Sequence, residues 1–172
     1  MTAPATQCRS KTHKLLLELQ GYPPLLVSRA LLLLAGEWTD SNLVCRIDPA
    51  RILAKAWHKG RLADCRERLA AGEQAPAISV VGFRIGRGAV LYDVSDGMHR
   101  TIAHREAGRK IKARISGYYR IEPSRYVLWR GHLWRQEKNR LYRADLEPVP
   151  EKLWQILQVL GVQDRNESQD HE

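Results

Sequence analysis

The fold is decided by residues 93–101, DVSDGMHRT, where an apolar strand passes through a glycine turn into a helix. The preceding run, AVLYDV at 89–94, is typical of a strand, and residues 100–107, closed by Gly108, are typical of a short helix. A tight turn from strand to helix places the first helical N–H groups, and the positive end of the helix dipole, at the turn. The segment therefore predicts an anion-binding turn in a small α/β protein of the α+β kind, built on a mixed sheet with helices.

The side chains of this turn suit a phosphate ligand. Gly97 allows the bend and a close approach of the ligand. Arg100 offers two parallel donors, and His99 and the Thr101 hydroxyl add further donors. The predicted phosphate-binding residues are Gly97, Met98, His99, Arg100 and Thr101. From spacing alone, a capped strand–helix turn with an exposed arginine fits equally well.

Candidate catalytic groups lie close to the turn. Asp96 can cap the helix, or hold a Mg²⁺ ion that bridges phosphates, and Asp96 and His99 are the predicted catalytic residues. Asp93 and Glu73 are the alternatives for an acid or a base. Asp93 and Asp96 together could also hold a metal ion for phosphodiester cleavage, so a nuclease remains a lower-ranked prediction.

A wider pattern surrounds the turn. A strand follows a proline, a second strand ends in Asp-Gly-x-His-Arg, a helix is closed by glycine, and a third strand returns. The segments are LAAGEQAPAISV (69–80), LYDVSDGMHRTIAHREAG (91–108) and IKARI (111–115), led by RIDPARI (46–52). This order resembles the ParB/sulfiredoxin-like superfamily over about residues 43–118. The resemblance implies a domain that binds CTP, ATP or ADP in different branches, with Gly97, His99 and Arg100 on the phosphates.

The chain departs from each branch of that superfamily. Sulfiredoxins place a cysteine where this chain has Met98, and a thioether cannot attack as a thiolate does, so sulfinic-acid repair is not expected. ParB partition proteins continue into a helix-turn-helix domain, whereas residues 119–172 read as strands and one helix. The serine-kinase branch has an early acid, and residues 49–63 contain none. Phosphoryl transfer or nucleotide hydrolysis is the leading expectation.

The rest of the chain divides into segments of different character. Helical periodicity predicts helices over 12–19, 24–36 and 49–71, the last as one or two helices. A β-meander is predicted at 126–143 and a helix at 150–160. The expected organisation is a helical N-terminal segment (1–42), the nucleotide-binding core (43–118), the meander with its helix (119–162) and a disordered acidic tail (163–172).

Charge and composition bound the function. The 172 residues carry 28 Lys+Arg against 19 Asp+Glu, a formal charge of +9, which favours a partner rich in phosphate. Basic residues cluster at 100–114 and again at 120–143, where tryptophan and tyrosine interleave with them, so DNA binding through a basic face is the alternative function.

Three widely spaced cysteines give no zinc motif and suit a reducing cytoplasm. No apolar stretch reaches membrane-spanning length, and the expected location is cytoplasmic.

Overall fold

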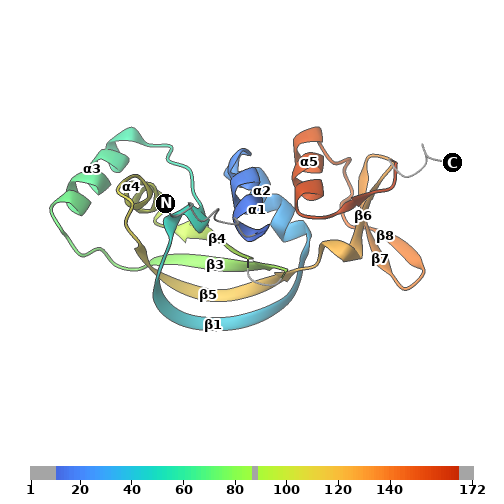
Figure 1. Ribbon diagram of the computed structural model, residues 1–172, viewed down its shortest axis with the longest axis horizontal. Coiled ribbons are helices and arrows are strands. Elements are labelled where there is room, and N and C mark those ends of the chain that lie inside the picture. The colour runs from blue at the N-terminus through green and yellow to red at the C-terminus, as the bar shows by residue number, and fades with distance from the viewer. Residues whose placement is uncertain (1–10, 87–88, 167–172) are drawn as a thin grey trace, which may run out of the picture.

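The computed structural model describes residues 11–86 and 89–166, so part of the turn expected at 86–88 and residues 167–172 of the predicted tail lie outside it. Its centre is a five-stranded mixed sheet in the order β1-β5-β3-β4-β2 (Figure 1). The strands are β1 (Ala35–Ile47), β2 (Ile52–Leu53), β3 (Ile78–Ile85), β4 (Ala89–Asp96) and β5 (Ile111–Ile121). β3 runs antiparallel to β4 and parallel to β5, which confirms the mixed α+β fold class.

Helices pack on both faces of this sheet. Neighbouring residues of a strand point to opposite faces, and in β4 Leu91 and Tyr92 belong to different apolar clusters. Leu91 packs in the cluster that includes residues of α1 (Lys11–Gln20), α2 (Pro24–Leu33) and α5 (Glu151–Val159). Tyr92 packs in the cluster that includes Met98 and Ile102 of α4 (Met98–Glu106).

The alternation predicted for β5 is confirmed. Ile111, Ala113 and Ile115 are all buried in the α4 cluster, and Lys112 and Arg114 between them are exposed. α3 (Lys59–Ala70) packs beside α4 at the end of the sheet away from the C-terminal strands (Figure 1). The Asp96–Arg100 turn therefore lies where the sheet meets α3 and α4.

The prediction of helices throughout 49–71 is wrong for its first half. Residues Pro49–Arg51 form a single 3-10 turn, β2 follows, and the α-helix begins only at Lys59. Ile52 is buried and pairs with Tyr92 of β4, so this apolar residue belongs to an edge strand and not to a helix. The N-cap is His58, whose Nδ1 accepts a hydrogen bond from the Arg61 N–H at 3.2 Å.

The expected boundary at residue 42 falls inside a strand. Helical structure ends at Leu33, and β1 then pairs with β5 along its length, from Ala35 opposite Ile121 to Ile47 opposite Ile111. β1 is an edge strand with mostly exposed side chains, so residues 35–42 lack the apolar alternation that predicts a strand. The prediction of a helical segment for residues 35–42 is therefore wrong.

The C-terminal meander is confirmed. Its strands are β6 (Tyr126–Trp129), β7 (His132–Glu137) and β8 (Arg140–Arg143). A short strand, β9 (Gln163–Asp164), pairs parallel with β6, so the predicted tail is ordered at its start. Asp164 also accepts a hydrogen bond from Trp154 Nε1 at 2.8 Å. Of the helices in the described parts of the chain, none combines the length and apolar character needed to cross a bilayer.

Candidate functional site

The turn predicted from the sequence is built around Gly97. Gly97 is the N-cap of α4 and has φ of +103°, a left-handed conformation that favours glycine. A Cβ at this position would collide with Ile78 Cγ2. No side chain within the described residues caps α4, and its first intrahelical bond runs from the Thr101 N–H to the Gly97 carbonyl at 2.9 Å. The N–H groups of the first helical turn are therefore available to an anion.

A hollow of about 450 Å³ opens in front of this turn and is called the turn hollow below. One wall is the turn itself, from Ser95 to Arg100. The other wall consists of Trp57 and four residues of α3, which are Arg61, Asp64, Cys65 and Arg68. The hollow thus collects three arginines, two carboxylates and an exposed indole around the start of a helix.

The α3 wall was missed in the sequence interpretation, although a signal for it exists. Asp64, Cys65 and Arg68 follow Arg61 by three, four and seven residues, which places all four on one helical face. α3 is held against α4 by two hydrogen bonds from the Arg66 guanidinium to the Glu106 carboxylate, at 2.7 and 2.8 Å. These bonds lower the pKa of Glu106 and raise that of Arg66.

Arg100 faces the turn hollow and is also engaged within the protein. Its Nη1 donates to the Pro76 carbonyl at 2.5 Å, and its Nη2 lies 3.2 Å from Asp96 Oδ2. The Arg100 side chain is 22 % exposed and the Asp96 side chain 78 %. Arg100 therefore joins the turn to the loop before β3 and presents only part of its guanidinium to a ligand.

His99 is more enclosed than a phosphate donor needs to be. The residue is 8 % exposed, and its Nε2 accepts a hydrogen bond from the His58 N–H at 3.3 Å. Its ring packs edge-on against Trp57, with centroids 4.6 Å apart. These contacts fix the loop that carries Trp57, so the geometry favours a positioning role for His99; its catalytic role stays a prediction.

Thr101 does not reach the hollow. It is fully buried, and its hydroxyl donates to the Gly97 carbonyl at 3.0 Å. The predicted phosphate contact from this hydroxyl is therefore wrong, because the hydroxyl is hydrogen-bonded within the turn. Met98, by contrast, lines the hollow and packs at the edge of the α4 cluster.

Neither of the two alternative acids lines the turn hollow. Asp93 lies on the sheet face covered by α2, where its Oδ2 accepts a hydrogen bond from Ser28 Oγ at 2.5 Å. Glu73 pairs with Arg68 at 3.7 Å and lines a separate hollow described below. Asp64, which the sequence interpretation did not single out, is the second carboxylate of the turn hollow beside Asp96.

A magnesium ion fits the turn hollow only together with a phosphate ligand. Among the described residues, no group of three or more histidine, cysteine, aspartate or glutamate side chains is placed to hold a metal. Mg²⁺ is usually bound by one or two carboxylates plus substrate phosphates and water. Asp96 and Asp64 both line the turn hollow, so they are the carboxylates that such an ion would use.

The aromatic residues of the meander are engaged by arginines. The Arg130 guanidinium lies 4.3 Å from the centre of the Trp129 ring, and that of Arg143 lies 5.5 Å from the Trp134 ring. Trp134 Nε1 also donates to the Trp129 carbonyl at 2.9 Å. An incoming base would have to displace these cations before it could stack on either ring.

His104, on the last turn of α4, predicts a pH dependence of stability. Its Nδ1 lies 3.1 Å from the Lys110 carbonyl, and burial lowers the pKa of the imidazole below its usual 6.5. Just below pH 6.5 this histidine is protonated in the unfolded chain but still neutral in the folded chain. The free energy of unfolding should therefore fall as the pH drops through 6.5. Urea titrations at pH 7.5 and 5.5 should show a smaller loss for His104→Gln than for the unsubstituted chain. Equal losses would contradict this assignment.

Together, the fold and site define a mixed α+β protein with a left-handed glycine between a central strand and a helix, facing a second helix across a basic hollow. No protein-family model matches the sequence, and none of the curated proteins matches it either.

Proposed function

We propose that this protein binds a nucleotide in the turn hollow, with the phosphates at the Asp96–Arg100 turn and the base against Trp57. The observation that carries the proposal is the position of an uncapped helix start opposite the arginines of α3. Backbone N–H groups and the helix dipole bind phosphate oxygens at such a start. The likeness of the turn motif to the ParB/sulfiredoxin-like superfamily supports the same ligand class.

The charges of the hollow favour an anion. Arg61 has no ion-pair partner within the described residues, and Arg68 is paired with Glu73 only at 3.7 Å. Both guanidiniums can therefore turn to a phosphate at little cost. A hydrogen bond to a charged group contributes about 1.5–3 kcal/mol, which corresponds to tenfold or more in affinity.

Trp57 supplies a surface for the base. It is 63 % exposed although it lines the hollow, and its ring packs at a steep angle against that of His99. An exposed indole beside a phosphate site suits base stacking, which contributes about 1–3 kcal/mol per base.

The bound nucleotide would serve as a phosphoryl donor, to an acceptor or to water. When bound, Mg²⁺ would neutralise charge on the phosphates, and Asp96 would hold it, which leaves Asp64 free. Arg61 and Arg68 would stabilise the charge of the transferred group from the α3 side. The carboxylate left free of the metal would orient the attacking hydroxyl or water and accept its proton.

Calorimetric titrations with ATP, ADP, CTP and GTP, with and without Mg²⁺, test the proposal. The Arg61→Ala/Arg68→Ala variant should lose tenfold or more in affinity for the preferred nucleotide, because two charged contacts disappear. Trp57→Ala should weaken the nucleotide but leave inorganic tripolyphosphate unchanged, because only the base is stacked. Turnover would be followed by release of inorganic phosphate.

The matched control removes two exposed arginines elsewhere. Arg140→Ala/Arg165→Ala carries the same charge change, and both residues are exposed in the C-terminal part of the chain. It should bind as the unsubstituted chain does. If both double variants lost nucleotide affinity equally, the loss would be explained by net charge alone, and the assigned site would be contradicted. Sequence-selective, tight DNA binding without nucleotide affinity would instead favour the DNA-associated alternative.

A further inference from the structure

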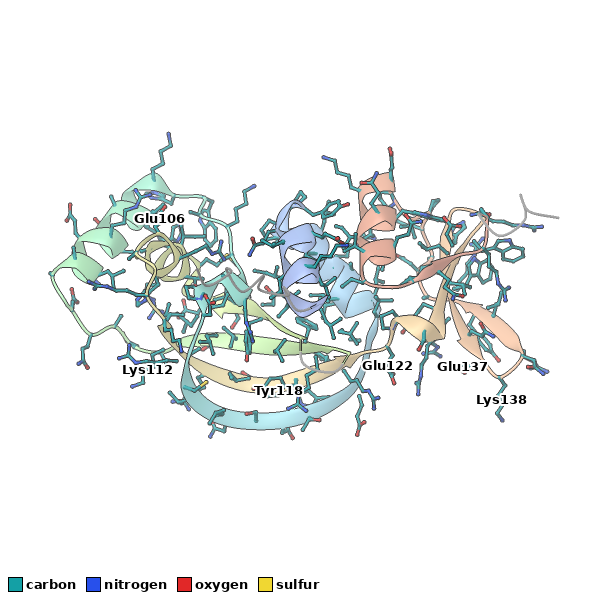
Figure 2. The ribbon with its side chains drawn as sticks, in the orientation of Figure 1. Glu106, Lys112, Tyr118, Glu122, Glu137 and Lys138 are labelled. Carbon is teal, nitrogen blue, oxygen red and sulfur yellow. The ribbon has the colours of Figure 1, made fainter. Side chains whose placement is uncertain are left out.

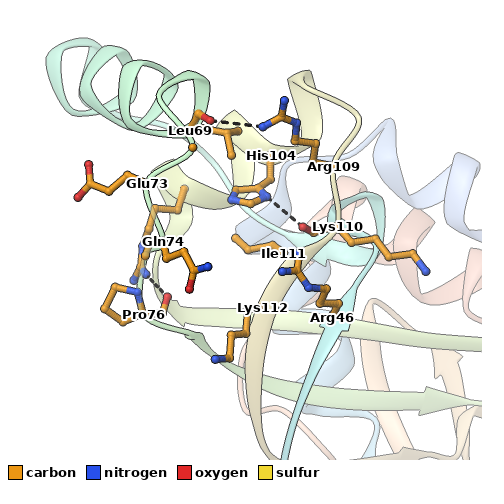
Figure 3. A pocket seen from close by; sticks show the side chains of 13 residues that line it. Arg46, Leu69, Glu73, Gln74, Pro76, His104, Arg109, Lys110, Ile111 and Lys112 are labelled. Carbon is orange, nitrogen blue, oxygen red and sulfur yellow. Dashed lines mark hydrogen bonds between the residues drawn. The ribbon is translucent and has the colours of Figure 1, made fainter.

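A second hollow, of about 460 Å³, is lined by the loop before β3 and is called the basic hollow below (Figure 3). It is enclosed by residues 72–76, the end of α4, and the adjoining ends of β1 and β5. Its cations come from three separate places in the chain: Arg46 on β1, Arg109 and Lys110 after α4, and Lys112 on β5. Lys112 and Glu106 mark this same end of the sheet (Figure 2).

Two of these cations face each other across a strand pair. Arg46 and Lys112 are direct partners in the β1–β5 register, and both are exposed. Like charges directly opposite each other destabilise a sheet. Within the described residues, Arg46, Lys110 and Lys112 form no ion pair that would offset this repulsion, and Glu73, the carboxylate of the basic hollow, pairs with Arg68. A bound anion would offset it.

The rim of the basic hollow is fixed by backbone contacts. Arg109 Nη1 lies 3.3 Å from the Leu69 carbonyl, and the His104 ring is hydrogen-bonded to the Lys110 carbonyl (Figure 3). Arg100 contacts the Pro76 carbonyl from the side of the turn hollow and lines both hollows. The loop before β3 is thus held at Leu69 and Pro76, so the cations surround a preformed space.

The lining of the basic hollow defines the ligand class. Among its described lining residues there is no tryptophan, tyrosine or phenylalanine, whereas there are several cations. Its volume lies within the range of small-molecule pockets. We propose that the basic hollow binds a compact anion carrying several phosphate groups, at a site distinct from the proposed nucleotide site and adjoining it at Arg100. Recognition is by charge and by the spacing of Arg46, Lys110 and Lys112.

The test uses inorganic tripolyphosphate in the Arg61→Ala background, where the turn hollow has lost a cation that does not line the basic hollow. Calorimetry should show saturable binding in that background. Adding Arg46→Ala/Lys112→Ala should reduce its affinity tenfold or more, because two charged contacts are lost. The matched control adds Arg140→Ala/Lys152→Ala, which removes one exposed arginine and one exposed lysine elsewhere and should change little.

Folding and ligand identity are checked in the same series. Since Arg46 and Lys112 are exposed and repel each other, their replacement should leave the melting temperature unchanged or raise it. Equal affinity for tripolyphosphate in the Arg46/Lys112 variant and its control would overturn the proposal. So would binding of a 20-nucleotide single strand that tripolyphosphate does not displace, because the hollow would then be a nucleic-acid surface. Neither result depends on whether a nucleotide occupies the turn hollow.

Discussion

Gly97→Ala should abolish nucleotide binding and lower the free energy of unfolding by about 2–4 kcal/mol. The new Cβ would collide with the Ile78 side chain, and alanine would be strained at φ of +103°. Relief of both requires the turn to move, and the first N–H groups of α4 would move with it. Urea denaturation would measure the loss of stability, and calorimetry with the preferred nucleotide would measure the loss of binding.

Gly108→Ala is the control for backbone strain. Gly108 has φ of +64° at the other end of α4, and a Cβ there would meet no atom within 4 Å. Gly108→Ala should therefore lower the free energy of unfolding by about 1 kcal/mol and leave nucleotide affinity unchanged. Unaltered affinity in a folded Gly97→Ala protein would contradict a phosphate site at this turn.

Leu157→Ala should destabilise the whole chain by about 2–5 kcal/mol, the usual cost of a cavity in a packed core. Leu157 lies on α5 and is fully buried in the cluster that also contains Phe83 of β3 and Leu31 of α2. The C-terminal segment therefore shares its core with the five-stranded sheet. Urea unfolding followed by far-ultraviolet circular dichroism and by tryptophan fluorescence should give one coincident transition at lower urea.

Two separated transitions would show the opposite, that residues 119–162 form an independent unit. The surface variant Lys152→Ala on the same helix is the matched control, since Lys152 is exposed. It should shift the transition by less than about 0.5 kcal/mol.

The central strands were predictable because their alternation is strong. Residues 78–83, 89–94 and 111–115 each carry apolar side chains that the structure buries. Two regions were not predictable for opposite reasons. The edge strand β1 has too few buried side chains to show a period, whereas Ile52, Leu53 and Trp57 mimic helical spacing although Ile52 and Leu53 form a short strand.

For the candidate site, local chemistry was visible and distant partners were not. The glycine turn and the start of α4 follow from residues 93–101 alone. The α3 wall depends on the packing of two helices that are separated by 27 residues, from the end of α3 at Ala70 to the start of α4 at Met98. Its arginines could therefore be found only by asking which helical face would meet the turn. The error on Asp93 was avoidable, because its neighbours Tyr92 and Val94 lie on the α4 side and alternation places Asp93 on the other.

The most direct test of the central claim is calorimetric titration of the unsubstituted protein with ATP, ADP, CTP and GTP in the presence of Mg²⁺. We expect saturable binding of at least one nucleotide at one site per chain, weakened tenfold or more in Arg61→Ala/Arg68→Ala and unchanged in Arg140→Ala/Arg165→Ala. The absence of binding by all four nucleotides at about 1 mM, in a protein that unfolds cooperatively, would contradict it.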